Sequence, residues 1–336
     1  MLRLEERLGY VHKGIERLAV GRDPQGLARL AARVSGDSTV AHAWAACQAL
    51  ERATGWAVPP RARSLRALLA ERERIANHLG DIGAICNDVG FAFALAQCGR
   101  LRELWQRRSQ ALFGHRLLMD RVVPGGATHD LDEAAAATLR ADHAELRRAL
   151  GPIFEIIEDH PSLDDRLFTT GRLAPADARA LGCTGYVGKA SGQAFDVRRD
   201  SPYPPYDALA VEVPTFTAGD VAARVRVRIG EIRASLTLLD RILEQLPGGP
   251  IIAAAPPAAP RPAGAERAGL GIVEGWRGEI LTYVRLDAAG RVARFFPRDP
   301  SWFTWPALER LVHGNIVPDF PVCNKSINGS YAGVDL

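Results

Sequence analysis

The five cysteines are the residues of this sequence best suited to metal or redox chemistry. They are Cys47, Cys86, Cys98, Cys183 and Cys323, an odd number in which no two are separated by only two residues. A disulfide framework and a CxxC metal site are therefore both unexpected. The first three stand in largely apolar, helical surroundings, so we interpret them as small buried hydrophobic residues. The eight histidines form no HExxH motif and no pair with ligand spacing, and each is interpreted as a packed or surface residue.

Two other motifs that could bind phosphate or nucleic acid also fail. The segment GCTGYVGKASG lacks the first glycine of a phosphate-binding loop, because Cys183 stands there, and Ala190 replaces the hydroxyl residue that follows the lysine. The run RVRVR at 224–228 lies within a helical pattern, so we interpret it as a solvated helix face. A net charge of only +3, from 42 Lys and Arg against 39 Asp and Glu, likewise predicts no nucleic-acid partner.

Most of the elements that would position such a site are predicted to be helices, because their apolar residues recur with a helical period. From the N-cap candidate Asp220, apolar residues recur at steps of four and three up to Leu246, which predicts a long helix with a narrow apolar seam. Four long helices separated by breakers favour a helical bundle, and we expect them at about 59–89, 101–122, 130–160 and 220–246.

The remaining segments are predicted to be less regular. They comprise a polar loop at 182–207, a Pro/Ala-rich spacer at 247–264, a hairpin over 279–296 with its turn at 287–290, and a short helix around 305–312. We treat the 336 residues as one domain with a helical core at about 40–246 and a C-terminal hairpin and tail at 265–336. No stretch reaches about 18 uninterrupted apolar residues and the start MLRLEERLGY is charged, so a soluble, cytoplasmic chain is expected.

An ordered series of segments carries a resemblance to a known family. These segments are LEERLGYVHKGIERL (4–18), ARVSGDSTVAHAWA (32–45), VPPRARSLRALLAERERIANHL (58–79), GHRLLMDRVVPGG (114–126), GCTGYVGKASGQAFDVRRDSPYPPY (182–206), VRVRIGEIRASL (225–236), LPGGP (246–250), WRGEILTY (276–283), DPSWFTWPAL (299–308) and GNIVPDFP (314–321). Together they resemble the large subunit of membrane-bound nickel-iron hydrogenases, including that of formate hydrogenlyase, and the 49 kDa or D subunit of NADH:quinone oxidoreductase. The resemblance implies a mainly α fold with small β elements, a hydrogenase-like bundle of long helices whose N-terminal β segment is missing.

The positions that hold nickel in such hydrogenases are altered. The family's RxCGxC and DPCxxC segments supply four thiolates, and here they correspond to residues 33–38 and 328–333. The thiolate positions are occupied by Ser35, Ser38, Ser330 and Gly333. A neutral serine hydroxyl cannot replace a thiolate as a nickel ligand, so we expect no metal and no hydrogen chemistry in this chain.

The quinone contacts of the complex I subunit are also altered. Its quinone-binding tyrosine corresponds to Gly36, and a histidine associated with the terminal iron-sulfur cluster corresponds to Leu118. Its other histidine contact lies in the N-terminal segment that has no counterpart here. Conventional quinone chemistry is therefore not predicted.

Four other family positions are retained. By resemblance, Arg33 and Arg116 lie near a partner's iron-sulfur cluster, where a positive charge would favour the reduced cluster, or they are structural ion-pair partners. His42 occupies the histidine position after the first motif, and Arg277 matches an arginine that overhangs the active-site cavity. The glycine-rich loop keeps its family pattern except that Lys189 replaces an arginine, and we interpret this loop as architectural.

The resemblance implies a nickel-free large subunit in a membrane-associated electron-transfer and ion-translocating complex, peripheral on the inner face of the cell membrane. The expected partners are an iron-sulfur small subunit, membrane subunits of an antiporter-like complex and a separate 30 kDa-like subunit that would carry the missing segment. The chain itself is expected to bind no cofactor, with the cluster in the small subunit and quinone as a candidate ligand. Two alternatives remain open: an active module that reduces quinone or another acceptor in a remodelled cavity, and a truncated, nonfunctional copy. Whether the chain is itself an enzyme also stays open.

Overall fold

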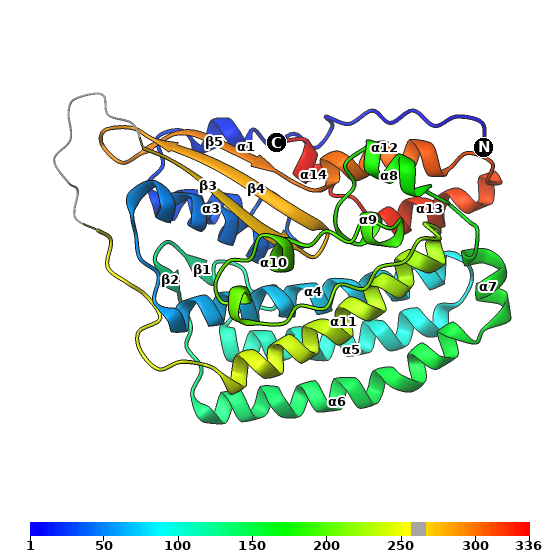
Figure 1. The fold of residues 1–336 in the computed structure, drawn as a ribbon, viewed down its shortest axis with the longest axis horizontal. Helices are drawn as coiled ribbons and strands as arrows, with labels where there is room; N and C mark the ends of the chain where they lie inside the picture. The colour runs from blue at the N-terminus through cyan, green and yellow to red at the C-terminus, as the bar shows by residue number, and fades with distance from the viewer. Residues whose placement is uncertain (257–266) are drawn as a thin grey trace.

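The computed structural model describes residues 1–256 and 267–336. Four long helices lie alongside one another beneath a three-stranded antiparallel sheet, and short helices connect the two layers (Figure 1). The fold is thus mainly α with small β elements, as predicted. The helices are α1 (Ile15–Ala19), α2 (Pro24–Ala31), α3 (Thr39–Thr54), α4 (Pro60–Asp88), α5 (Ala92–Phe113), α6 (Glu133–Glu158), α7 (Pro161–Leu167), α8 (Pro175–Ala180), α9 (Gly185–Ala190), α10 (Val197–Asp200), α11 (Val221–Glu244), α12 (Ser301–Leu311), α13 (Phe320–Ile327) and α14 (Tyr331–Val334), with 3-10 turns η1 (Tyr206–Ala208) and η2 (Val317–Asp319).

Helix α4 forms the centre of the molecule. It begins at Pro60, where proline is favoured in the first helical turn, and its end at Asp88 agrees with the prediction. Neighbours enclose α4 on several sides, since α3, α5, α11 and α13 all pack against it. As a result even the consecutive charged residues of the run 71–74 are buried.

Helix α11 has the predicted bounds but not the predicted exposure. The Asp220 carboxylate accepts a hydrogen bond from the Ala223 amide at 2.8 Å and caps the helix as expected. The predicted narrow seam and solvated arginine face are both wrong, because α11 is buried on nearly all sides and Arg224 and Arg228 have no exposed surface. Their guanidinium groups are satisfied internally by backbone carbonyls, a serine hydroxyl and Asp81.

Three other helical predictions need correction. The helix expected at 101–122 is α5, which begins nine residues earlier and ends at Phe113, because Gly114 adopts the left-handed conformation (φ +71°) and caps it. The polar loop expected at 182–207 contains the short helices α9 and α10. Helix α3 was anticipated only by the helical surroundings of Cys47 and received no predicted bounds, because a helix buried over most of its surface has no apolar period to detect.

The predicted hairpin forms, and a third strand extends it. Strands β4 (Gly278–Leu286) and β5 (Val292–Arg298) flank the expected turn, and β3 (Arg267–Gly275) pairs with β4. Strand β3 lies directly on α3, where a Cβ atom at Gly269 or Gly271 would meet a carbonyl oxygen of α3 at 2.1 or 1.9 Å. These two glycines therefore permit the close contact between sheet and helix.

A second small hairpin of β1 (Val122–Val123) and β2 (Gly126–Ala127) lies near the start of the predicted spacer. The spacer at 247–264 lies partly outside the described residues, and its described part has no helix or extended strand, only an isolated bridge between Gly126 and Ile252. The short C-terminal helix is α12, which begins four residues before the predicted start.

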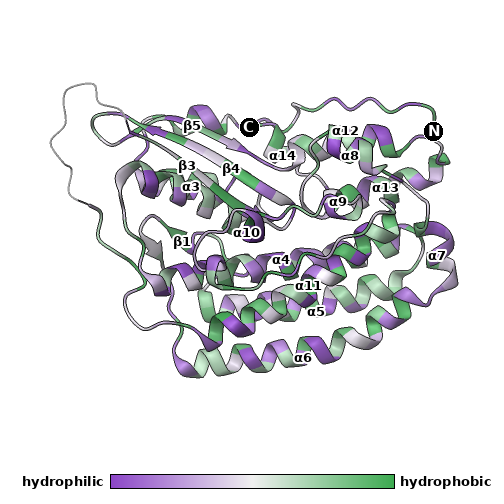
Figure 2. Ribbon diagram, in the orientation of Figure 1, coloured by the Kyte–Doolittle hydropathy of each residue, from purple (hydrophilic) through white to green (hydrophobic). Residues whose placement is uncertain are grey.

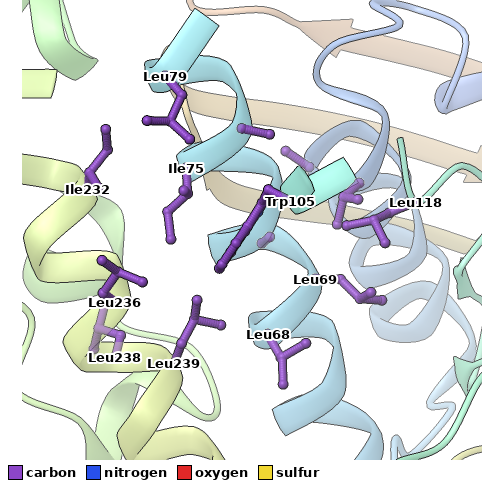
Figure 3. Packing of buried hydrophobic residues seen from close by; sticks show 14 of the residues in the cluster. Leu68, Leu69, Ile75, Leu79, Trp105, Leu118, Ile232, Leu236, Leu238 and Leu239 are labelled. Atoms are coloured by element: carbon purple, nitrogen blue, oxygen red, sulfur yellow. The ribbon is translucent and has the colours of Figure 1, made fainter. Parts of the chain in front are cut away.

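The main core fills the space between α4 and α11. Leu68, Ile75 and Leu79 of α4 face Ile232, Leu236 and Leu239 of α11 across this interface (Figure 3). All six are essentially inaccessible to solvent. Apolar and polar residues alternate along the outer helices, and the outermost helix α6 shows this mixture clearly (Figure 2).

Candidate functional site where the two sequence motifs meet

The two altered motifs, almost 300 residues apart, meet in space. The Ser330 hydroxyl donates to the Ser35 hydroxyl at 2.9 Å, and Ser35 in turn donates to the Asp37 carboxylate at 2.7 Å. Ser330 also caps α14, because its Oγ accepts the Gly333 amide at 2.9 Å. Three of the four altered nickel-ligand positions, Ser35, Ser330 and Gly333, are thus joined by hydrogen bonds.

Arg277 holds this contact together from the turn between β3 and β4. Its guanidinium makes two hydrogen bonds to Asp37, at 2.6 and 2.7 Å, and a third to the Ser38 hydroxyl at 3.2 Å. Its Nε donates to the carbonyl of Asn328 at 2.7 Å. Burial disfavours the Asp37 carboxylate, but the Arg277 charge and hydrogen bonds outweigh it and lower the pKa of Asp37 to about 2. We call the set Ser35, Asp37, Ser38, Arg277, Asn328 and Ser330 the motif seam.

The altered ligand position at Gly333 also borders on a buried His–Asp pair. His42 Nε2 lies 2.9 Å from Asp299 Oδ2, and both side chains are inaccessible to solvent. Asp299 fills the space beside Gly333, where an added Cβ would lie 2.7 Å from the carboxylate. Burial opposes its charge, yet the His42 hydrogen bond and the nearby Arg277 keep the pKa of Asp299 below its ordinary value. A side chain at position 333 is therefore excluded by the carboxylate that binds His42.

The other two predicted arginines lie outside the motif seam. Arg33 pairs with Asp120, with Nη2 and Oδ2 2.8 Å apart, and Arg116 pairs with Glu103. Their side chains are 41% and 46% exposed, so both are open to solvent in this chain. The ion pairs match the structural interpretation, while proximity to a partner's cluster stays a prediction.

The donor set of the seam does not suit nickel. It offers hydroxyls and one carboxylate already bound to arginine, whereas nickel in such a site needs soft thiolates. Within residues 1–256 and 267–336, no three His, Cys, Asp or Glu side chains come close enough together to hold a metal ion. All five cysteines are buried and form no disulfide, and burial raises the pKa of the Cys86, Cys98 and Cys183 thiols to about 12.

A buried ionic cluster beside the seam was not anticipated. Lys189 of α9 lies 2.7 Å from Asp196, 2.7 Å from Glu231 and 3.5 Å from Glu274. Burial works against its charge, but these three carboxylates raise the pKa of Lys189 above its ordinary value. Burial and the neighbouring Asp196 raise the pKa of Glu274 to about 7. The full cluster consists of Glu71, Arg74, Lys189, Asp196, Arg198, Glu231 and Glu274.

This cluster joins five parts of the chain. Arg198 of α10 makes hydrogen bonds to Glu71 of α4 at 3.0 Å and to Asp196 at 2.7 Å. Arg74 of α4 lies 3.2 Å from Glu231 of α11 and donates to the carbonyl of Glu274 on β3 at 2.8 Å. These contacts agree with an architectural role for the glycine-rich loop. The one sequence signal was the run of four charges inside a predicted apolar helix, residues 71–74.

The positions of the altered quinone contacts line a small cavity. Gly36 and Leu118 lie on its wall together with residues of α4 and α5, and its volume is about 20 Å³. A volume of this size accommodates about one water-sized molecule rather than a quinone ring. Leu118 adopts a left-handed backbone conformation (φ 61°), which is uncommon outside glycine.

Comparisons with known proteins find two matching families and several similar relatives. The family described as "Respiratory-chain NADH dehydrogenase, 49 Kd subunit" matches residues 88–268, and "Nickel-dependent hydrogenase" matches residues 13–80. The carbon monoxide-induced hydrogenase of Rhodospirillum rubrum is 34% identical over 95% of this chain and 88% of its own length. An NADH-quinone oxidoreductase subunit of Dehalococcoides mccartyi is 32% identical over 99% of this chain and 90% of its own length.

One further relative is longer than this chain, and another similar chain is known from a solved structure. Formate hydrogenlyase subunit 5 of Escherichia coli is 32% identical over 98% of this chain, which spans 57% of that protein. A chain of the membrane-bound sulfane sulfur reductase, described as an archaeal respiratory membrane complex, superposes with a TM-score of 0.92 at 26% identity, covering 100% of this chain and 91% of that chain. In the described part of this chain, no helix is long and apolar enough to cross a membrane.

Proposed function

The chain belongs to the family that unites the 49 kDa subunit of respiratory-chain NADH dehydrogenase with the nickel-dependent hydrogenases, and from this premise we propose that it is a nickel-free large subunit. It docks an iron-sulfur small subunit at the periphery of a membrane complex that couples electron transfer to ion movement. A solved structure similar to this chain comes from a respiratory membrane complex, which supports the assembly.

One observation carries the nickel-free assignment: the motif seam replaces a metal-binding donor set with hydrogen bonds between the same two motifs. In the seam, Ser330 and Ser35 bond to each other, and Arg277 fixes Asp37 in its ionised form. A metal would have to displace these bonds and would find no thiolate. The chain's own residues therefore keep the two motifs together without a bridging metal.

The partner-facing surface is proposed to include Arg33. This arginine lies just before the seam, and its 41% exposed side chain can meet a negatively charged cluster environment in a second subunit. Its bond to Asp120 holds the guanidinium in place but leaves it open to solvent. Quinone reduction in the cavity at Gly36 is less well supported, because that cavity has room for about one water-sized molecule.

The test is metal analysis of the chain purified together with its iron-sulfur small subunit. We expect iron and acid-labile sulfide in the complex, no stoichiometric nickel, and no hydrogen-dependent dye reduction. Arg33→Glu is expected to weaken co-purification of the small subunit at least tenfold, since it reverses the charge at the proposed surface. The exposed Arg148→Glu, on the outer helix α6, serves as the matched control.

Nickel at one atom per chain together with hydrogen turnover would disprove the nickel-free assignment. Equal recovery of the small subunit with wild type, Arg33→Glu and Arg148→Glu would remove Arg33 from the docking surface.

A further inference from the structure

A pocket on the surface has more hydrogen-bond donors on its wall than the protein itself uses. It lies between the C-terminal half of α3, the start of α4 and the loop that contains Tyr203, and its volume is about 310 Å³, a size suited to a small molecule. This junction lies at the opposite end of the molecule from α12 and α13 (Figure 1). Arg52 on its wall is about 20 Å along α3 from Ser38 of the motif seam, at a rise of about 1.5 Å per residue. The pocket is therefore separate from the seam.

Three side chains on the wall have nitrogen donors from which no described residue accepts a hydrogen bond. Trp44 and Gln48 are four residues apart and so lie on one face of α3, and Arg63 is near the start of α4. Although Trp44 and Gln48 are only 2% and 9% exposed, the Trp44 indole nitrogen and the Gln48 Nε2 have no partner. Gln48 itself is held in place, because its Oε1 accepts the Ile272 amide at 3.2 Å. Neither these two nitrogens nor those of Arg63 are enclosed polar atoms, so all three donors open onto the pocket.

The wall also carries an excess of positive charge. Glu51 is its one carboxylate, and both of its oxygens accept hydrogen bonds from Arg66, at 2.6 and 3.0 Å. Arg52 donates to the neutral carbonyl of Leu270 at 2.7 Å. Within the part of the chain that the structure describes, neither Arg52 nor Arg63 has an acidic partner. Two guanidinium charges are thus left for a ligand.

Arg63 stands between this pocket and a second one. Arg63 and Pro204 line both, and the second pocket has a volume of about 290 Å³. Asp207, the acid on the wall of the second pocket, is exposed and forms no ion pair with Arg63. A ligand bound by Arg63 therefore has room on both sides of the guanidinium group.

Trp56 supplies a fixed aromatic surface on the same wall. Its Nε1 donates to the carbonyl of Ala253 at 3.1 Å. Its ring lies so close to Gly125 that a Cβ atom added there would be 2.5 Å from Nε1. The side chain is partly exposed, so a flat ring of a ligand can stack against it.

We propose that this pocket binds a small aromatic oxyanion, that is, a flat ring bearing a carboxylate or phosphate group. The two unpaired guanidinium groups supply the charge, Gln48 and Trp44 donate to the remaining oxygens, and the Trp56 ring packs on the ring of the ligand. The carboxylate and the amide oxygen on the wall are already bound, so the free polar groups there are donors that suit an acceptor-rich anion. This site requires neither the motif seam nor a partner subunit and is independent of the nickel-free assignment.

The test is titration calorimetry of the full chain at constant ionic strength with phenyl phosphate and with benzoate. Inorganic phosphate and benzyl alcohol serve as the anion and the ring alone. We expect saturable binding of phenyl phosphate or benzoate, at least tenfold tighter than that of either half. The preference between the first two ligands identifies the anionic group. Absence of saturable binding, or inorganic phosphate binding as tightly as phenyl phosphate, would overturn the proposal.

Two variants locate the bound ligand. Arg63→Met should weaken binding at least tenfold, because it removes a charged donor that has no partner in the protein itself. Arg100→Met is the matched control, since Arg100 of α5 is exposed and lines none of the pockets found in the described residues. Equal affinities for wild type, Arg63→Met and Arg100→Met would place the ligand elsewhere.

Gln48→Glu tests the charge of the wall by a different route. It keeps an oxygen for the Ile272 amide but adds a carboxylate, so binding should weaken at least tenfold with the folded structure intact. A measurement that needs no variant is a crystal of the full chain soaked in 4-bromobenzoate. We expect anomalous bromine density beside Trp56 with the carboxylate toward Arg63. Bromine density absent from this pocket would contradict the proposal.

Discussion

Gly333 stands where the family has its fourth thiolate, and its neighbours no longer admit a side chain. The Asp299 carboxylate occupies the space that a Cβ would need, and that carboxylate is fixed by His42 and by the Ser301 amide at 2.8 Å. In this chain the Asp299 carboxylate therefore takes the place of a side chain at position 333. Reintroducing cysteine at this position would require Asp299 to move.

We predict that Gly333→Ala lowers the free energy of unfolding by about 1–3 kcal/mol, the usual cost of forcing an extra group into a packed site. Gly36→Ala is the control, because a Cβ there meets nothing within 4 Å and the residue is exposed. Its effect should stay within about 0.5 kcal/mol. Chemical denaturation of both variants decides the matter, and equal effects would refute the steric argument.

For individual residues, the sequence indicated which ligand positions of the family are altered, but not which contacts now join the two motifs. Ser35, Ser38, Ser330 and Gly333 follow from the resemblance, whereas the pairing of Asp37 with Arg277 and of His42 with Asp299 spans about 240 and 257 residues. No local pattern encodes contacts of that separation. The sequence shows which charged residues could act as partners, but it does not show which of them lie close together in space.

The elements show the same division between local and long-range information. Helices α4, α6 and α11 were predicted because their apolar residues recur with a helical period and end at breakers. Strand β3 was missed because its glycines at 269, 271 and 275 interrupt the β-rich pattern. Helix α3 was given no predicted bounds because burial over most of its surface removes the apolar period, although Cys47 was placed in helical surroundings. The same enclosure explains why arginines of α11 that were predicted to be solvated are buried.

The buried ionic cluster makes a quantitative prediction about these elements. Replacing Arg198 with Met would leave Glu71 and Asp196 without a main cationic partner inside the protein. We expect a loss of about 3–5 kcal/mol of unfolding free energy, as for other buried pairs that lose one member.

The control for this experiment is Arg107→Met. Arg107 pairs with Glu103 on the surface and is 71% exposed, so its removal should cost less than about 1 kcal/mol. Urea denaturation of both variants tests the difference. If Arg198→Met were as mild as Arg107→Met, the cluster would not hold α4, α10 and α11 together.

At the scale of the whole molecule, an N-terminal strap, residues 1–11, starts beside α12 and α13 and runs along the upper edge toward α1 (Figure 1). The amide of Glu6 donates to Glu309 at 2.8 Å, and the amides of Gly9 and Val11 donate to Asp335 at 2.7 and 3.1 Å. Leu4 and Leu8 pack against the C-terminal part of the core. The first and last residues of the chain therefore stabilise each other.

This strap should detach as the pH rises. Burial and the nearby Glu309 raise the pKa of Glu6 to about 8, well above the value of 4.5 in the unfolded chain. The folded state therefore binds a proton that the unfolded state releases, so this contribution is full below about pH 4.5 and is lost as the pH rises through about 8. We expect faster proteolysis of the strap at pH 9 than at pH 6.

Glu6→Gln should keep the strap protected at both pH values, because it cannot ionise. Glu5→Gln, at a neighbouring position that is exposed, should behave like wild type. Amide hydrogen exchange of residues 1–11, corrected for its intrinsic pH dependence, measures the same opening. Identical protection ratios for wild type and Glu6→Gln would show that Glu6 does not control the strap.

The joining of early and late residues sets the order of events during translation. Ser35, Asp37 and His42 leave the ribosome long before Ser330, Arg277 and Asp299 are synthesised. The nascent polypeptide must therefore keep these polar groups hydrated, with its first helices incompletely packed, until Ser330 has left the ribosome. Folding of this region is consequently dominated by distant contacts, which slows folding and lengthens the period in which chaperones can bind.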